Sequence, residues 1–324
     1  MLLDRFGRSI DYLRVSVTDR CDLRCSYCMP PEFKGFEDPP DWLSFDEIER
    51  VVAAFVRLGT RRVRLTGGEP LTRRQIPQLA ARLSALPGLS DLSMSTNATM
   101  LTRHAEALKA AGVGRLNVSL DSLDRASMAS ITGRDSLPSI LAGLQAARAA
   151  GFDPIKINMV AMRGVNDHEI DAMVAFCIEH HFTLRLIEVM PMGSTGQNSA
   201  FLPLAEVYER LRARFDLQVQ SAELGGGPAR YLSTSDGTTS IGFITPLSQH
   251  FCASCNRVRL AVDGTLYLCL GQEEKFELRP LLRGGATDAE LENAIRSAIE
   301  LKPEQHDFGR TPDKIIRFMS QTGG

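Results

Sequence analysis

Three cysteines stand close together near the start of the chain, in Cys21-Asp22-Leu23-Arg24-Cys25-Ser26-Tyr27-Cys28. The C-x₃-C-x₂-C spacing lets three thiolates on one loop bind three irons of a four-iron cubane, so the fourth iron has no protein ligand. Iron–sulfur proteins that only carry electrons normally give each iron a cysteine. An open iron is chemically available, as is the open coordination position of a catalytic zinc. The loop therefore predicts a cluster that binds a substrate.

A second cysteine set contains Cys252, Cys255 and, farther on, Cys269. Taken alone, C-x₂-C with a third cysteine is typical of a zinc site, for which His250 is a candidate fourth ligand. Beside the first triplet, a second open four-iron cluster is the better interpretation, and zinc stays as the alternative. Cys177 lies on the apolar stripe of an expected helix and indicates a buried structural thiol.

Three further segments allow both a structural and a functional interpretation. Gly67-Gly68-Glu69-Pro70 is either a tight turn or a place where backbone approaches a ligand closely, because glycine has no Cβ. Arg257 and Arg259 share one strand face, and their guanidinium groups suit phosphate oxygens unless they are solvated surface residues. The final Gly323-Gly324 is either a frayed end or a segment that can enter a narrow pocket because it carries no side chains.

The elements that must position these residues alternate in type. Segments typical of strands are 12–18, 62–66, 91–97, 115–121, 155–160 and 184–189, with amphipathic helices between them. The cysteine loop and the glycine segment follow strands, at the end where parallel barrels keep their active sites. We expect an α/β fold in which residues 1–193 form an incomplete parallel (β/α)6 TIM-type barrel with the first cluster. Residues 194–324 should form a smaller C-terminal α+β region with the second cluster and the Gly-Gly tail.

Polar residues alternate along these strands, although buried parallel strands are usually continuous apolar runs. One face of the sheet carries Arg14, Ser16, Arg64, Ser93, Ser95, Asn117, Ser119, Lys156 and Asn158. One interpretation is a sheet with a solvated face. The interpretation we prefer is that helices cover the apolar face and the polar face lines the barrel, which makes a pocket for a polar anion.

Bulk properties exclude several classes of partner. The 324 residues are 44% hydrophobic, with a net charge of −2 and seven cysteines. No global basic field is expected to hold nucleic acid or an anionic membrane, and no apolar run approaches the roughly 18 residues of a membrane span. The start of the chain lacks a secretory apolar region. We expect a cytoplasmic protein whose cysteines bind metal and do not form disulfides.

The motifs together resemble a known family. The cysteine loop, with Tyr27 before its last cysteine, and the glycine segment resemble those of radical S-adenosylmethionine enzymes. A finer resemblance is to the GTP 3′,8-cyclase family of molybdenum cofactor biosynthesis. The matching segments are 13–21, 64–71, 117–123, 252–259 and the Gly-Gly end. They span nearly the whole chain, so the match is specific although each stretch is short.

The resemblance implies roles for individual residues. Two [4Fe-4S] clusters are implied, one on Cys21, Cys25 and Cys28 and one on Cys252, Cys255 and Cys269. S-adenosylmethionine is implied as cosubstrate on the open iron of the first cluster, in contact with Tyr27, Gly68, Ser119 and Met190. GTP is implied to contact Arg14, Arg64, Ser95, Lys156, Arg257, Val258 and Arg259, and the family usually has threonine where Ser95 stands. Catalytic roles are implied for Arg257, Arg259, Gly323 and Gly324.

The implied activity is that of a lyase. A 5′-deoxyadenosyl radical takes the 3′ hydrogen of GTP, and the resulting carbon radical attacks C8 of guanine. The resemblance also implies a reductant protein or reductase as electron donor and product transfer to cyclic pyranopterin monophosphate synthase, and it allows a homodimer. Two alternatives remain: a radical peptide- or protein-modifying maturase with an auxiliary cluster, and a zinc-ribbon-like binding module appended to a barrel.

Overall fold

The computed structural model describes residues 1–30, 39–220, 227–308 and 315–323. Twelve strands form one sheet in the order β12-β11-β10-β1-β2-β3-β4-β5-β6-β9-β8-β7. The strands are β1 (Tyr12–Ser16), β2 (Arg62–Thr66), β3 (Asp91–Thr96), β4 (Arg115–Ser119), β5 (Ile155–Ala161), β6 (Thr183–Glu188), β7 (Gln218–Gln220), β8 (Arg230–Ser233), β9 (Ser240–Ile244), β10 (Arg257–Leu260), β11 (Thr265–Tyr267) and β12 (Lys275–Glu277).

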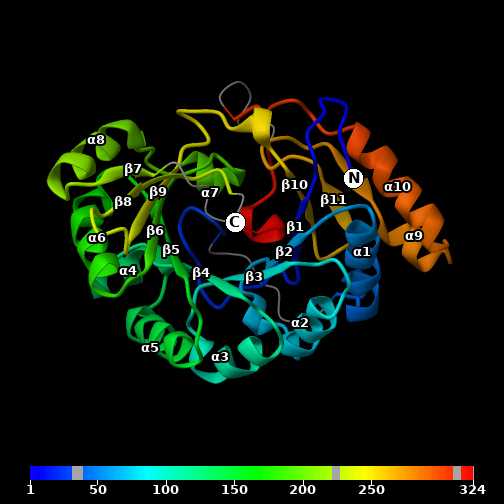
Figure 1. Ribbon diagram of the computed structural model, residues 1–324, viewed down its shortest axis with the longest axis horizontal. Coiled ribbons are helices and arrows are strands. Elements are labelled where there is room, and N and C mark those ends of the chain that lie inside the picture. Colours follow the sequence, from blue (N-terminus) through cyan, green and yellow to red (C-terminus); the bar gives the residue numbers. More distant parts are fainter. Residues whose placement is uncertain (31–38, 221–226, 309–314, 324) are drawn as a thin grey trace.

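The central strands, from β10 through β1–β6 to β9, are all parallel. Antiparallel strands β11 and β12 extend one edge, and β8 and β7 extend the other. The sheet curves into an open arc (Figure 1). The predicted incomplete barrel is confirmed, and β9 and β10 add two parallel strands to the expected six. Sequence patterns assigned both to a separate region because no regular βα period leads up to them. The division at residue 193 stays a prediction.

Helices cover the outer face of the arc, as Figure 1 shows. The helices of the described residues are α1 (Phe45–Arg57), α2 (Ile76–Ser84), α3 (Leu101–Ala110), α4 (Arg125–Thr132), α5 (Leu137–Ala149), α6 (Ile170–Glu179), α7 (Gly193–Gln197), α8 (Leu204–Arg214), α9 (Arg279–Arg283), α10 (Asp288–Glu300) and α11 (Met319–Thr322), with short 3₁₀ turns at Pro70–Thr72, Asp167–Glu169 and Cys252–Ser254. Of these, α11 lies inside the arc and not on its outer face. Within the described ranges, none of these helices has the length and apolar character that crossing a membrane requires.

Alternation along each strand separates the core from the interior of the arc. Leu13, Val15, Val63 and Leu65 are fully buried in the main apolar cluster, which also contains residues of α1 and α2. The intervening positions point to the other face. There Arg259, Arg14, Arg64 and Ser93 lie side by side in register, as do Ser95, Asn117 and Lys156. The polar side chains thus form layers across neighbouring strands.

Candidate active site

The first cysteine loop follows β1 and is attached to the end of α4. The backbone N–H of Arg24 donates to the carbonyl of Thr132 (2.8 Å), and that of Ser26 donates to the carbonyl of Ile131 (2.9 Å). These bonds resemble a short strand pairing and fix the loop against a helix. The predicted metal-binding loop therefore has a rigid support.

The three thiols of this loop are free and half-buried. The Sγ of Cys21 accepts hydrogen bonds from the backbone N–H of Leu23 (3.4 Å) and from Nδ2 of Asn97 (3.7 Å). Burial raises the pKa of all three thiols, that of Cys28 to about 12. The metal-free loop is therefore protonated at neutral pH, and binding a metal must displace these protons.

Gly67 and Gly68 bring the end of β2 against the cysteine loop. Gly67 has a φ of 137°, and a Cβ on either glycine would lie 2.1 Å from a carbonyl oxygen, that of Thr18 or that of Arg20. The N–H of Gly68 donates to Thr18 (2.8 Å), and the N–H of Glu69 donates to Arg20 (2.6 Å). The absence of a Cβ is thus required here for backbone contact with the cysteine loop.

The carboxylate of Glu69 joins the ends of β2 and β3. It accepts hydrogen bonds from the N–H of Leu71 (3.1 Å), the hydroxyl of Thr96 (2.8 Å) and the N–H of Asn97 (2.6 Å). Burial raises the pKa of Glu69 to about 7, although these hydrogen bonds act in the opposite direction. Glu69 therefore fixes the backbone on which Asn97 reaches Cys21.

A cavity of about 1010 Å³ lies over the first cysteine loop. Its lining includes the three cysteines and all four residues expected to contact the cosubstrate: Cys21, Cys25, Cys28, Tyr27, Gly68, Ser119 and Met190. The hydroxyl of Tyr27 donates to Asp121 (2.8 Å), whose other oxygen accepts from the N–H of Val160 (2.9 Å). Burial raises the pKa of Asp121 to about 6. The loop and β4 are thus linked across this cavity.

A second cavity, of about 1030 Å³, contains the other cysteine set. Its lining includes Cys252, Cys255, Cys269, Arg14, Arg64, Arg257, Val258 and Arg259. The two cavities share Asn158, Ile187 and Met190 as lining residues. Molecules bound over the two cysteine sets would therefore lie next to each other.

Lys302 joins the two chain segments that carry the second cysteine set. Its side chain is almost fully buried, and its Nζ donates to the carbonyls of Arg257 (3.1 Å) and Leu268 (2.6 Å). One carbonyl lies just after Cys255 and the other just before Cys269. A buried ammonium thus holds the two thiols in one place.

Arg8 supports the same region from the N-terminus. Its guanidinium forms a buried ion pair with Asp4 (2.6 Å). It also donates to the carbonyls of Cys252 (2.9 Å), Pro303 (2.6 Å) and Glu304 (2.6 Å). Segments about 250 residues apart in the chain are therefore bound together beside the second set.

Buried positive charge is concentrated on one side of the second cavity. Arg14 lies in register between Arg64 and Arg259 on adjacent strands. Burial, together with the neighbouring guanidiniums, lowers the pKa of Arg14 and lowers that of Arg259 to about 9. Within the described parts of the chain, Arg14 and Arg64 form no ion pair, and the Nε of Arg14 has no hydrogen-bond partner. Unpaired buried cations of this kind require an anion.

The C-terminal tail lies inside the arc, where α11 ends (Figure 1). Arg259 donates to the carbonyls of Thr322 (3.3 Å) and Gly323. Gly323 has a φ of 70°, and a Cβ there would lie 2.3 Å from the hydroxyl of Thr66. Gly323 is therefore buried and held beside Arg259, whereas Gly324 lies outside the described residues. The catalytic role of the tail stays a prediction.

Both cysteine sets suit a four-iron cluster with one open iron. Each offers three free thiols at the wall of a cavity. Polar atoms without a partner in the described residues also face the first cavity, namely the hydroxyl of Ser95 and Oδ1 of Asn158. The donor sets and the room beside them agree with the chemistry that the cysteine spacing predicts.

Two predicted substrate residues lie apart from the rest. Ser95 lines the first cavity, beside the cysteine loop, and is not among the lining residues of the second. Lys156 is buried and lines neither cavity, and its Nζ lies 5.8 Å from the ring of Tyr231. Burial and neighbouring arginines lower the pKa of Lys156 to about 7. The roles of both residues stay predictions.

Sequence reasoning missed several side chains of the second cavity. The ring of Tyr12 lies between the guanidiniums of Arg64 (5.4 Å), Arg257 (5.7 Å) and Arg14 (5.9 Å). Arg185 lies beside Asn158 in register, and strand alternation could have found it. Arg8 and Lys302, described above, and His306 carry no local signal, because only tertiary contacts bring them to the site.

Two family models cover most of the chain. The model described as "Radical SAM superfamily" matches residues 15–177, and the one described as "Molybdenum Cofactor Synthesis C" matches residues 182–308. Curated relatives named GTP 3',8-cyclase align along the whole chain. The protein of Erythrobacter litoralis (strain HTCC2594) is 46% identical and that of Pseudomonas putida (strain W619) is 47% identical, each over 100% of this chain and 98% of the relative.

This chain belongs to the GTP 3',8-cyclase family of the radical SAM superfamily. The resemblance stated from the motifs is confirmed. The family explains why both cysteine triplets and the Gly-Gly end occur in one chain. It also favours clusters over the zinc-ribbon-like module.

Solved structures agree on the fold. Streptococcus suis SuiB bound to S-adenosylmethionine has a TM-score of 0.62 and 18% identity, over 90% of this chain and 68% of that one. SuiB bound to the precursor peptide SuiA has a TM-score of 0.63 and 18% identity, over 90% and 67%. At this identity the likeness concerns the fold only, and it confirms the radical SAM type of incomplete barrel.

Proposed function

We propose that this protein cyclises GTP to (8S)-3′,8-cyclo-7,8-dihydroguanosine 5′-triphosphate, an early step of molybdenum cofactor biosynthesis. One observation carries the proposal. Two cysteine triplets line adjoining cavities, and the second cavity is also lined by Arg14 and Arg64, which form no ion pair with any residue that the structure describes. The membership of the chain in the GTP 3',8-cyclase family supports the same conclusion.

In this proposal each triplet holds a [4Fe-4S] cluster. Cys21, Cys25 and Cys28 hold the first cluster, and Cys252, Cys255 and Cys269 hold the second. The first cluster, when reduced, supplies the electron that splits S-adenosylmethionine into methionine and a 5′-deoxyadenosyl radical. The protein supplies orientation and excludes water and other hydrogen donors.

The first cavity orients the cosubstrate. Gly68 leaves room for close backbone approach, and Ser119 offers a hydroxyl. Tyr27 is held by Asp121, so its ring and backbone keep a fixed position beside Cys28. Met190 lines both cavities and therefore stands between cosubstrate and substrate.

The second cavity binds GTP. A triphosphate carries a charge of about −4, which charge-assisted hydrogen bonds from Arg14 and Arg64 would offset. The family resemblance adds Lys156, although this residue lies outside the lining of the cavity. Arg257, Val258 and Arg259 begin two residues after Cys255 and line the same cavity as its thiol, where they would contact the substrate. Ser95 contributes a hydroxyl where the family usually has threonine.

The C-terminal tail contributes to catalysis through Arg259. Because Arg259 donates to the carbonyl of Gly323, the tail and the guanidinium position each other. The family resemblance assigns Arg257, Arg259, Gly323 and Gly324 to the catalytic group, and this hydrogen bond supports the assignment for Arg259 and Gly323. Deleting Gly323 and Gly324 should lower cyclisation while both clusters remain.

Further partners belong to the proposal. The electron donor is a reductant protein or reductase, and the product passes to cyclic pyranopterin monophosphate synthase. We place the reaction in the cytoplasm, and the family resemblance allows a homodimer. The two-part division into residues 1–193 and 194–324 belongs to the same set of expectations.

The test is anaerobic incubation with GTP, S-adenosylmethionine and a reductant. We expect the cyclised nucleotide together with 5′-deoxyadenosine, and about eight irons per chain in the loaded protein. Formation of 5′-deoxyadenosine at the same rate without GTP would count against GTP as substrate. The variant Cys21→Ala should abolish cleavage of S-adenosylmethionine and keep the second cluster.

A further inference from the structure

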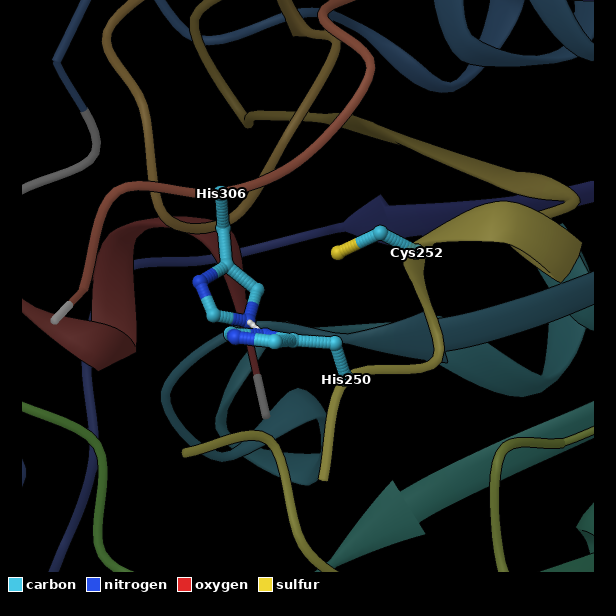
Figure 2. Close-up of side chains that lie close together, drawn as sticks. All are labelled: His250, Cys252 and His306. Carbon is cyan, nitrogen blue, oxygen red and sulfur yellow. Dashed lines mark hydrogen bonds between the residues drawn. The ribbon is translucent and has the colours of Figure 1, made fainter. Parts of the chain in front are cut away.

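Two histidines lie beside the second cysteine set. His250 precedes Cys252 by two residues, and His306 comes from the segment after α10. Nδ1 of His250 is 3.2 Å from Nε2 of His306, and one ligand atom from each histidine and the Sγ of Cys252 all lie within 4.8 Å of one another. Figure 2 shows both rings and the thiol around one space.

We propose that His250, Cys252 and His306 bind one zinc ion when the second cluster is absent. We further propose that zinc and the cluster exclude each other, since Cys252 cannot serve both. This inference goes beyond the proposed function, and it concerns the protein before it is loaded with iron. Two imidazoles and one thiolate, with water as fourth ligand, form a donor set that zinc accepts.

The distances suit a tetrahedral ion. Zinc–nitrogen bonds of about 2.1 Å place two ligand nitrogens about 3.4 Å apart. The two ring nitrogens are already 3.2 Å apart. Nε2 of His306 also lies 2.8 Å from the carbonyl oxygen of Pro246, and an ion bound to this nitrogen would replace that hydrogen bond. The thiol must approach by roughly 1 Å to reach a normal zinc–sulfur distance of about 2.3 Å.

The surroundings allow a metal ion to enter and to stay. His250 is exposed and Cys252 is half-buried, whereas His306 is buried, so the site has one open side. The positive charge of Arg8 could repel a metal ion, but it is already paired with the carboxylate of Asp4 (2.6 Å). Lys302 also faces the thiol, with its ammonium bound by two carbonyls.

The test is cobalt(II) and zinc(II) titration of chelator-treated full-length protein under anaerobic conditions. A Cys21→Ser/Cys25→Ser background removes metal binding by the first loop. We expect one cobalt per chain, with a thiolate-to-cobalt absorption band and the strong visible bands of tetrahedral cobalt. His250→Gln should weaken binding at least about tenfold. Cys269→Ser is the matched control, since it removes a cluster ligand outside the trio, and its affinity should stay within about twofold.

Two outcomes would overturn the proposal. If His250→Gln and His306→Gln both bind cobalt as the parent does, the three cysteines hold the ion and the histidines are only a hydrogen-bonded pair. If Cys269→Ser weakens binding as much as His250→Gln, the trio is not the site. Because His250 is exposed, its substitution should leave the fold intact, and a thermal unfolding curve checks this.

Competition with the cluster gives a second readout. Zinc added to the Cys21→Ser/Cys25→Ser protein before reconstitution with iron and sulfide should reduce iron from about four per chain to near zero. The same treatment of this protein with the further change His250→Gln should leave iron near four. Equal iron in the treated and untreated Cys21→Ser/Cys25→Ser protein would also refute the proposal. None of these measurements uses GTP or S-adenosylmethionine, so their failure is separate from failure of the proposed cyclisation.

Discussion

Gly68→Ala should remove the first cluster and leave the second in place. A Cβ at residue 68 would lie 2.1 Å from the carbonyl oxygen of Arg20, which immediately precedes Cys21. Restoring an ordinary carbon–oxygen separation of about 3.2 Å requires a movement of about 1 Å. The opposing atom is backbone, so no side-chain rotation relieves the contact. The cysteine loop itself must move.

The expected cost follows from that displacement. Overpacking of this kind typically destabilises a protein by about 1–3 kcal/mol, and a backbone clash lies toward the upper end. A 1 Å error in positioning can also lower a reaction rate by about 10²-fold. We therefore expect iron to fall from about eight to about four per chain after anaerobic reconstitution. Binding of S-adenosylmethionine, measured by calorimetry, should be lost.

Gly114→Ala is the matched control. A Cβ there would lie 3.7 Å from the carbonyl of Leu92, which is ordinary contact. This variant should keep about eight irons and normal cosubstrate binding. Full iron and unchanged affinity in Gly68→Ala would show that the loop absorbs the clash, and the reasoning from close backbone approach would fail.

Three further outcomes are expected. Lys302→Met keeps the packing of the aliphatic part of the side chain but loses two hydrogen bonds from a charged donor, each worth about 1.5–3 kcal/mol. Iron should therefore fall to about four per chain, while S-adenosylmethionine still binds. Asp4→Asn leaves the buried Arg8 without its charge partner, so it should lower the free energy of unfolding by about 3 kcal/mol. A denaturant titration measures this, and an unchanged midpoint would contradict the prediction. Burial and nearby arginines hold the pKa of Lys156 at about 7, so above that pH the free protein carries it neutral, and binding of an anion restores the proton. GTP affinity should therefore decrease as the pH rises from about 6 to about 8. Calorimetry in buffers of different ionisation enthalpy should show proton uptake on binding. Equal proton uptake in Lys156→Met would argue against this role.

Local patterns predicted which residues surround the first cavity. The cysteine spacing, the glycine segment and the strand alternation each lie within a few residues, and all three meet at one cavity. The alternation also predicted that Arg14 and Arg64 face the interior. Such features survive folding because a strand fixes which side chains share a face.

The rest could not be found from local patterns. The position of β10 beside β1 depends on pairing between distant segments, so its sequence gives no sign that it extends the barrel. Arg8 and Lys302 bind backbone carbonyls far away in the chain, and a carbonyl has no sequence signature. His306 is near His250 for the same long-range reason.

The placement of β1 between β2 and β10 has a consequence for biogenesis. Tyr12 pairs with Arg257, which a ribosome adds 245 residues later. At about 5–20 residues per second, one edge of the first strand waits roughly 12–50 seconds for its neighbour. An edge left open for that time invites pairing with other nascent chains, and the charged side chain of Arg14 in the middle of β1 opposes it. Growth conditions that slow translation should therefore lower the soluble yield of this protein more than that of a barrel whose neighbouring strands follow one another in sequence.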